Sequence, residues 1–374
     1  MKSISFPCLA LLVACGGDST AVVPDALVDG GGGGADTSIP KDGGGNPDGS
    51  NPGKDSSSGC GTCPTTYTCG SANGLPVCRA PSGVPLFSKV IVIMMENTTQ
   101  ATLQAQMSGS GAPYFASMKT KYATGLNYHG VAHPSLGNYI ALTSGDTQGI
   151  ACDCKPDANQ GTCNIATCNL VIGSCSCNQA VSHLGDQIDT AKRSWSQFSE
   201  DMGTPCSTTD TGGYVARHVP FLYYDNVRND ATRCAARIVD FTKFDPNKAP
   251  DFSLIAPNLV HDMHDPFPAS ATNIANGDKW IAPQVEAILQ STAYTSGGLL
   301  VVVWDEDDAS GGLGGSDDPV PIFVLSPFAK SGGYTSALKA DHYSLLATIE
   351  DGMGLPRLAK AAKATPLADY FPAN

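Results

Sequence analysis

Several segments of the chain are runs of four to six consecutive apolar residues, many of them β-branched. Runs of this length predict strands that are buried on both faces, as in a parallel sheet. Two other segments place apolar residues at the spacing of a helix. The pattern predicts strands at residues 90–95, 252–256, 299–304 and 320–325, and helices at 280–289 and 342–351. This alternation predicts an α/β layered domain with a mostly parallel central sheet.

Two of the predicted strands end directly at oxygen-bearing side chains. Glu96 and Asn97 follow the first strand, and Asp305 and Glu306 follow the third. Taken alone, Glu96 could be solvated and Asn97 could cap a helix. The same arrangement at a second strand favours a metal site, because ligands bind beyond the carboxyl ends of parallel strands. Oxygen ligands suit Mg, Mn or Ca, and Fe or Zn stays open.

The acidic run continues past the second pair. Asp307 and Asp308 extend it, and we expect these two to be solvated or to support the ligands from behind.

A serine lies in a turn-prone stretch at residues 133–139, just before a helical pattern at 139–145. A helix N-terminus offers free N–H groups to a phosphoryl oxygen, which suits Ser135 as a nucleophile. The alternative is that Ser135 or Asn138 only caps the helix. No Gly-x-Ser-x-Gly motif surrounds the serine, which weakens a lipase or esterase interpretation.

Residues 261–265 contain two histidines and two aspartates around Met263. Histidine can bind a phosphate or protonate a leaving oxygen, and a neighbouring aspartate fixes its tautomer. The alternative is a polar surface loop. We expect Met263 to be a packing residue.

The N-terminal region has the features of an exported protein. An apolar stretch at residues 4–13 precedes Cys15, which predicts a signal peptide at 1–15 with a lipobox cysteine. Lipid anchoring in the bacterial cell envelope and cleavage with secretion are the alternatives. Residues 16–58 are rich in Gly, Asp, Ser and Pro, which predicts a disordered tether.

The chain has 14 cysteines, and removal of Cys8 and Cys15 leaves 12, an even number that favours disulfides in an exported protein. One group lies in a small module at residues 59–80, and another in an insertion at about 151–178. A zinc site in the first group is a weaker alternative. The connectivity stays open. The cysteines are Cys60, Cys63, Cys69 and Cys78, then Cys152, Cys154, Cys163, Cys168, Cys175 and Cys177, and finally Cys206 and Cys234, which could close a loop.

The remaining residues, 85–373, are long enough for one large domain, which we expect to be monomeric. The net charge of −13 argues against a nucleic-acid partner. An acidic protein that binds a phosphate must neutralise it locally, and a divalent metal would do so.

The motifs, taken in order, resemble the bacterial phosphoesterase family, which contains secreted acid phosphatases and the non-haemolytic type of phospholipase C. The resemblance covers residues 89–358. The matching residues are Met95, Glu96 and Asn97; His133, Pro134, Ser135, Asn138 and Tyr139; Pro257, Asn258 and Leu259 with residues 262–265; Gly277, Asp278 and Trp280; Trp304, Asp305 and Glu306; and residues 342–351.

The resemblance implies an alkaline-phosphatase-like three-layer α/β/α sandwich with one metal ion and a covalent phosphoenzyme. It makes Ser135 the nucleophile and lets Asn138 hold phosphoryl oxygens. His133, His264 and Asp265 match a polar shell around the phosphate. The implied metal ligands are Glu96, Asn97, Ser135, Asp305 and Glu306.

The chain also departs from the family pattern. Gly137 stands where proline is usual, and His261 replaces a common asparagine. Residues 316–321 lack a histidine that many members carry. These departures affect the expected shape of the pocket and the group that protonates the leaving oxygen.

Together these features predict a metal-dependent hydrolase of phosphate monoesters, an acid phosphatase that could act on phosphoinositide-like lipids. A phospholipase C that cleaves phosphodiesters is the first alternative. The second is a surface-binding protein that has lost activity, with the cysteine module and tether serving attachment.

Overall fold

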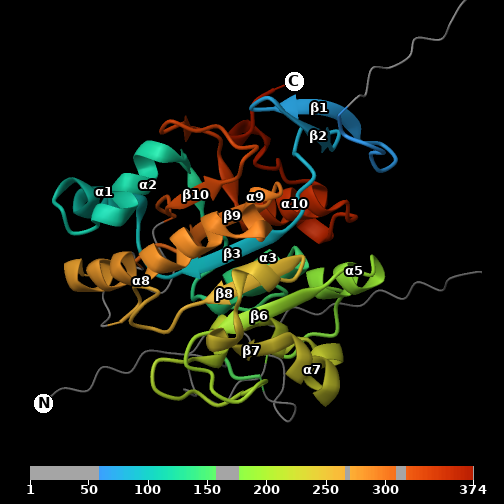
Figure 1. Cartoon of the computed structure of the whole chain (residues 1–374). Helices are drawn as coiled ribbons and strands as arrows, with labels where there is room; N and C mark the ends of the chain where they lie inside the picture. The colour runs from blue at the N-terminus through green and yellow to red at the C-terminus, as the bar shows by residue number, and fades with distance from the viewer. Residues whose placement is uncertain (1–58, 157–176, 266–269, 309–316, 374) are drawn as a thin grey trace, which may run out of the picture. The chain divides into compact units, whose positions relative to one another are not determined.

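An eight-stranded sheet forms the centre of the protein (Figure 1), in the strand order β11-β4-β10-β9-β3-β8-β6-β7. Only β10 runs antiparallel to its neighbours, β9 and β4. All other neighbouring pairs are parallel. The strands are β3 Val90–Met95, β4 Ala123–Gly125, β6 Trp195–Ser199, β7 Ile238–Asp240, β8 Phe252–Ala256, β9 Leu299–Trp304, β10 Ile322–Leu325 and β11 Thr335–Ser336. The predicted mostly parallel sheet is confirmed.

This computed structural model describes residues 59–156, 177–265, 270–308 and 317–373. The predicted signal peptide, lipobox and tether lie outside the described residues, as do most of the insertion and the glycine-rich segment at 309–316. The domain boundaries proposed for those parts stay predictions. No helix in the described ranges combines the length and apolar character needed to cross a bilayer.

The three central strands begin and end where the apolar pattern predicts. Every residue of β3, β8 and β9 is buried, because the sheet is covered on both faces and a strand in its middle meets apolar groups on each side. The fourth predicted strand begins two residues late, at Ile322. β6 was missed because Gln197 interrupts it, yet this amide is buried and donates to the carbonyl of His218.

Helices cover both faces of the sheet and complete the three layers (Figure 1). One group contains α8 with α1, α2 and α9, and another contains α3 with α5 and α10. Phe115 of α2 packs against Trp304 and Phe323 of the sheet. The helices are α1 Gln100–Ser108, α2 Pro113–Lys121, α3 Leu136–Ser144, α5 Leu184–Thr190, α6 Asp225–Arg228, α7 Ala231–Arg237, α8 Ala271–Gln290, α9 Thr292–Thr295 and α10 His342–Met353.

The remaining elements are short. Two 3₁₀ turns, η1 Ala216–His218 and η2 Pro220–Tyr223, precede α6. The others are η3 Phe241–Lys243, η4 Pro246–Lys248, η5 Ala359–Ala362 and η6 Ala368–Tyr370. A two-stranded parallel sheet joins β5 Tyr128–His129 to β12 Ala340–Asp341.

The first cysteine group forms a small hairpin of β1 Thr68–Ala72 and β2 Leu75–Arg79. Its disulfides are Cys60–Cys69 and Cys63–Cys78, so no thiolate is left for the alternative zinc site. The predicted Cys206–Cys234 bridge is present, and Cys154 pairs with Cys177. The cysteines of the described residues therefore serve as covalent cross-links.

Candidate active site

The two predicted acidic strand ends meet at one edge of the sheet. β3 and β9 are neighbours with Met95 opposite Trp304, so the residues that follow each strand emerge side by side. The side chains of Glu96, Asn97, Asp305 and Glu306 are all buried there. The parallel register alone thus turns two distant sequence motifs into one cluster of oxygen ligands.

Contacts within this cluster fix its geometry. The Asn97 side-chain amide donates to Glu306 Oε1 at 3.2 Å, and its backbone N–H donates to Asp305 Oδ1 at 3.3 Å. Asn97 adopts a left-handed conformation with φ of 44°, which asparagine tolerates better than most residues. His342 holds the end of β9 from behind, because its Nε2 lies 2.6 Å from the Asp305 carbonyl oxygen.

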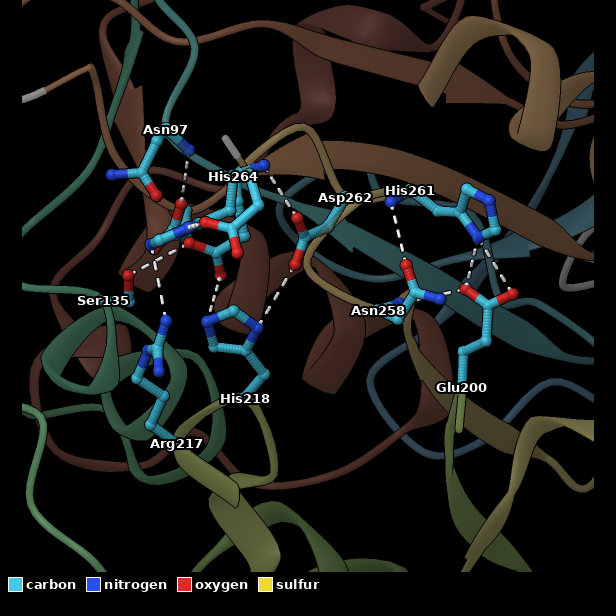
Figure 2. A network of polar contacts seen from close by, with 12 residues as sticks. Asn97, Ser135, Glu200, Arg217, His218, Asn258, His261, Asp262 and His264 are labelled. Carbon is cyan, nitrogen blue, oxygen red and sulfur yellow. Dashed lines mark hydrogen bonds and ion pairs between the residues drawn. The ribbon is translucent and has the colours of Figure 1, made fainter. Parts of the chain in front are cut away.

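Ser135 points into the cluster from the start of α3. Its Oγ donates to Glu96 Oε2 at 3.0 Å and lies 3.3 Å from Glu306 Oε1 (Figure 2). It stands at the N-cap position but makes no capping bond. The Leu136 N–H instead donates to Asp153 Oδ1 at 3.0 Å. The capping alternative for Ser135 is therefore wrong.

Asn138 supports the loop over the serine. Its Oδ1 accepts from the N–H groups of Val131 and Ala132, at 2.8 and 3.0 Å. Its amide nitrogen donates to the Ala132 carbonyl at 2.8 Å and to Glu306 Oε2 at 3.3 Å. These four contacts use both lone pairs and both hydrogens of the amide. The resemblance implied that Asn138 holds phosphoryl oxygens, whereas its amide here is occupied by the protein.

The same loop explains why glycine occupies position 137. A Cβ there would lie 2.6 Å from the Cβ of Ala132, so any side chain, including the proline of the family pattern, would push the loop away. Gly137 thus permits the close approach of residues 131–132 to α3.

A histidine that the sequence analysis did not assign lies beside Glu96. His218 comes from η1, and its Nε2 is 3.2 Å from Glu96 Oε1 while its Nδ1 is 3.3 Å from Asp262 Oδ2. Its ring stacks on Tyr139 at 5.2 Å between centroids, and the Tyr139 hydroxyl donates to Glu96 Oε1 at 2.5 Å. Figure 2 shows the His218 imidazole between two carboxylates, one of them Asp262.

Residues 261–265 form a loop that reaches the same centre. Asp262 and Met263 are fully buried, so a polar surface loop is the wrong description for them, and the predicted packing role of Met263 is confirmed. His264 Nδ1 lies 2.8 Å from Asp265 Oδ1, and its Nε2 lies 3.4 Å from Arg217 Nη2. Arg217 also pairs with Asp153 at 3.4 Å.

The loop is held to the sheet from its outer side. Glu200, which follows β6, accepts from His261 Nδ1 at 2.9 Å, from Trp280 Nε1 at 2.9 Å and from the N–H of Asn258 at 3.0 Å. His261, the departure from the family pattern, is thus an anchor of the loop rather than a member of the buried centre (Figure 2).

His133 occupies the opposite side of the cluster. Its Nδ1 lies 2.9 Å from Glu306 Oε2, and its Nε2 lies 3.7 Å from Asp307 Oδ2. Asp307 is buried, so of the two expected roles it has the supporting one. His133 and Asp307 line an open cavity of about 340 Å³ together with Gly130, Val131, Ala132, Asp317 and Asp318.

The electrostatics of the centre are dominated by buried carboxyl groups. Burial raises the pKa of Glu96 well above its usual value, and neighbouring Asp305 and Asp262 raise it further. Burial and Glu306 likewise raise the pKa of Asp305. Burial opposes a charge on His133, but Glu306 outweighs it and raises the pKa of the imidazole. Burial lowers the pKa of His264.

Residues 95–356 match the Phosphoesterase family. The chain belongs to this family. It is a hydrolase of phosphoric esters, and the resemblance seen in the motifs is confirmed.

Curated relatives carry phosphatase names. The chain is 29% identical over 297 residues to a phosphatidylinositol-3-phosphatase of Mycobacterium tuberculosis, covering 78% of this chain and 85% of that protein. It is 27% identical over 253 residues to an acid phosphatase of Aspergillus fumigatus, covering 63% of this chain and 49% of that protein. The chain thus spans about half the length of the fungal enzyme.

Among solved structures, a protein in the alkaline phosphatase superfamily from Vibrio parahaemolyticus is similar over 80% of this chain and 73% of that one. The TM-score is 0.48 and the sequence identity is 11%.

Sequence reasoning missed Arg217 and His218, which approach Glu96 and His264, as well as Asp153 and Glu200. The signal that could have found the first two is a charged pair inside an otherwise apolar run at residues 214–224. Such a run predicts burial, and a buried Arg-His pair needs partners. No comparable pattern surrounds Asp153 or Glu200.

Proposed function

We propose that the protein hydrolyses phosphate monoesters with the help of a divalent metal ion and through a phosphoserine at Ser135. The observation that carries this proposal is the position of the serine hydroxyl, which contacts two buried carboxylates instead of capping its own helix. The phosphatase names of the relatives support monoesters as the substrate class.

The residues present fit a metal ion. Asn97 Oδ1 and Asp305 Oδ2 are buried without a hydrogen-bond partner, which is costly unless a ligand completes them. Together with Glu96 and Glu306 they offer the oxygen donors that hard divalent cations prefer. These four residues and Ser135 would hold the ion. Bound there, it would lower the pKa of the serine hydroxyl and neutralise charge on the phosphoryl oxygens.

The protein groups divide the remaining work. Glu96 accepts the hydrogen bond of Ser135 and orients Oγ for attack, in which the Oγ–P bond forms and the bond to the leaving oxygen breaks. Water then attacks the phosphoserine, releasing inorganic phosphate and restoring the hydroxyl. Arg217 and His264 lie on the other side of Glu96, where they can donate to phosphoryl oxygens.

The leaving oxygen needs a proton, and His133 is the better donor of the two histidines considered. Its pKa is raised and it lines the open cavity, whereas the pKa of His264 is lowered. Asp265 then serves to orient His264 through Nδ1. Asn138 positions the loop that carries His133.

The test compares a chromogenic phosphate monoester with a phosphodiester, with and without chelator, and adds rapid quenching to trap a phosphoenzyme. We expect chelator-sensitive monoester turnover and a trapped phosphoserine that Ser135→Ala abolishes. Ser144→Ala, a buried serine on the same helix, is the matched control and should keep both. Turnover in Ser135→Ala would overturn the nucleophile assignment.

The same assay separates the alternatives. A preference for the diester, with release of a phosphorylated head group from a lipid, would indicate a phospholipase C. Metal binding without turnover of either ester would indicate a binding protein that has lost activity.

We also propose that the protein is exported and anchored through Cys15. The disulfides support an oxidising compartment, because such bonds are rare in the cytosol. Labelling of growing cells with a palmitate analogue should mark the wild-type protein and not Cys15→Ala. A wild-type protein that stays unlabelled and appears in the medium would instead indicate secretion.

A further inference from the structure

Glu96 presents its two carboxylate oxygens to different neighbours. Oε2 faces Ser135, while Oε1 faces Tyr139 and His218. On that second side the ligand atoms of Glu96, His218 and Asp262 all lie within 4.8 Å of one another. Each of the three residues is at most 3% exposed, so water does not fill the space between them.

Two of these atoms have contacts of opposite charge type but no hydrogen bond. Asp262 Oδ2 and His218 Nε2 are buried without a hydrogen-bond partner, although they lie 3.3 Å from His218 Nδ1 and 3.2 Å from Glu96 Oε1 respectively. A buried polar atom left in this state costs roughly 1–3 kcal/mol. Both atoms belong to groups that bind metals, and both border the same small space.

The local charge leads to the same conclusion. Four buried carboxyl groups meet here, those of Glu96, Asp262, Asp305 and Glu306. Arg217 is the nearest guanidinium, and it is also paired with Asp153. One divalent ion balances two of the four negative charges, and a phosphate monoester adds further negative charge. A second divalent ion would restore the balance in a region with little water.

We propose that Glu96, His218 and Asp262 hold a second divalent cation, with Glu96 bridging it to the first. This inference rests on the proposed function, because it adds to the metal site there. Carboxylate-bridged ion pairs about 3.5–4 Å apart occur in phosphatases and clamp the attacking and leaving oxygens. An imidazole nitrogen with carboxylate oxygens suits Mn, Fe or Zn better than Mg or Ca.

The test measures metal stoichiometry and coupling in the whole protein. Chelator-stripped protein is reloaded with Mn²⁺, desalted and analysed for metal per chain, and its electron paramagnetic resonance spectrum is recorded. We expect two ions per wild-type chain and a spin-coupled spectrum. His218→Ala and Asp262→Asn should each hold one ion and give the spectrum of an isolated Mn²⁺. Glu286→Gln, an exposed acid bonded to Tyr114, is the control and should keep two.

The wild-type protein decides the question even if a variant does not fold. One ion per chain with an uncoupled spectrum and normal turnover would overturn the second site and leave the proposed function intact, with His218 acting as a charged clamp between its two carboxylates. Turnover with no bound ion would overturn both.

Discussion

Two pairs of adjacent acidic residues in this chain have opposite fates. Asp305 and Glu306 end β9, whereas Glu350 and Asp351 lie within α10. Around the first pair the nearest charged groups include other carboxylates, and the one cationic contact of Glu306 is His133. Around the second, Asp351 is held by Arg357 and Ser82, and Glu350 accepts the Leu358 N–H at 2.8 Å.

The difference teaches how buried acids signal function. Asp351 finds a cation within the fold and is a structural group that fastens the helix to its surroundings, including the Tyr67 hydroxyl of the hairpin. Asp305 keeps an unpartnered oxygen and a raised pKa, which a bound cation would relieve. Incomplete compensation by the protein, more than burial, separates a candidate ligand from a structural acid.

The largest expected effect comes from removing one charge of the first pair. Asp305→Asn should lower kcat/KM by on the order of 10³, because a ligand that acts on transition-state charge is lost. The metal-free variant should unfold at the same temperature as metal-free wild type or higher, since repulsion among the carboxylates falls. Calorimetry with and without Mn²⁺ checks this. A lower melting temperature without metal would show that Asp305 is a structural acid after all.

The next prediction concerns Glu350, whose pKa burial raises to about 8. Because the folded state keeps this carboxyl protonated while the unfolded state ionises near its usual pKa, stability is present at low pH and falls as pH rises toward 8. Between about pH 5 and 8 the loss is on the order of 3 kcal/mol. Glu350→Gln should remove it, as urea unfolding at both pH values would reveal. Parallel curves for the two proteins would contradict the assignment.

A smaller effect is expected from the hairpin beside the second pair. Replacing Cys63 and Cys78 by serine opens a loop with a sequence separation of 15, which costs about 3 kcal/mol in the chain-entropy account. The hairpin should become sensitive to protease while kcat stays unchanged. Limited proteolysis with a parallel assay tests both parts. A fall in kcat would mean that the hairpin shapes the active site.

The smallest effect makes the second pair more like the first. Arg357→Gln removes the guanidinium from Asp351 and should cost about 1–2 kcal/mol, because the ion pair is partly exposed. Chemical denaturation measures it, and activity should not change. Arg357→Lys, which keeps the charge but not the paired donors, should lose less.

Much of the fold could be predicted from the apolar pattern, because a strand in the middle of a covered sheet needs an uninterrupted apolar run. β3, β8 and β9 show such runs and were found with their bounds. β4, β7 and β11 have two or three residues each, too few for a periodic signal. Their pairing is decided by the elements that flank them.

The candidate site divides in the same way. Glu96, Asn97, Ser135, Asp305 and Glu306 stand at recognisable positions, directly after strands or before a helix, and the structure brings them together. His218 and Arg217 come from a short 3₁₀ turn that no pattern marks. Asn138 matched a motif, but its surroundings determine that its amide supports a loop.

The sequence by itself determined the central strands, the oxygen ligands at their ends and the family, because these depend on local order along the chain. The tertiary structure alone decided which carboxylates remain without a cation and which distant imidazole lies between two of them. Those properties depend on the charges that surround a group in space, and segments far apart in the sequence supply these charges.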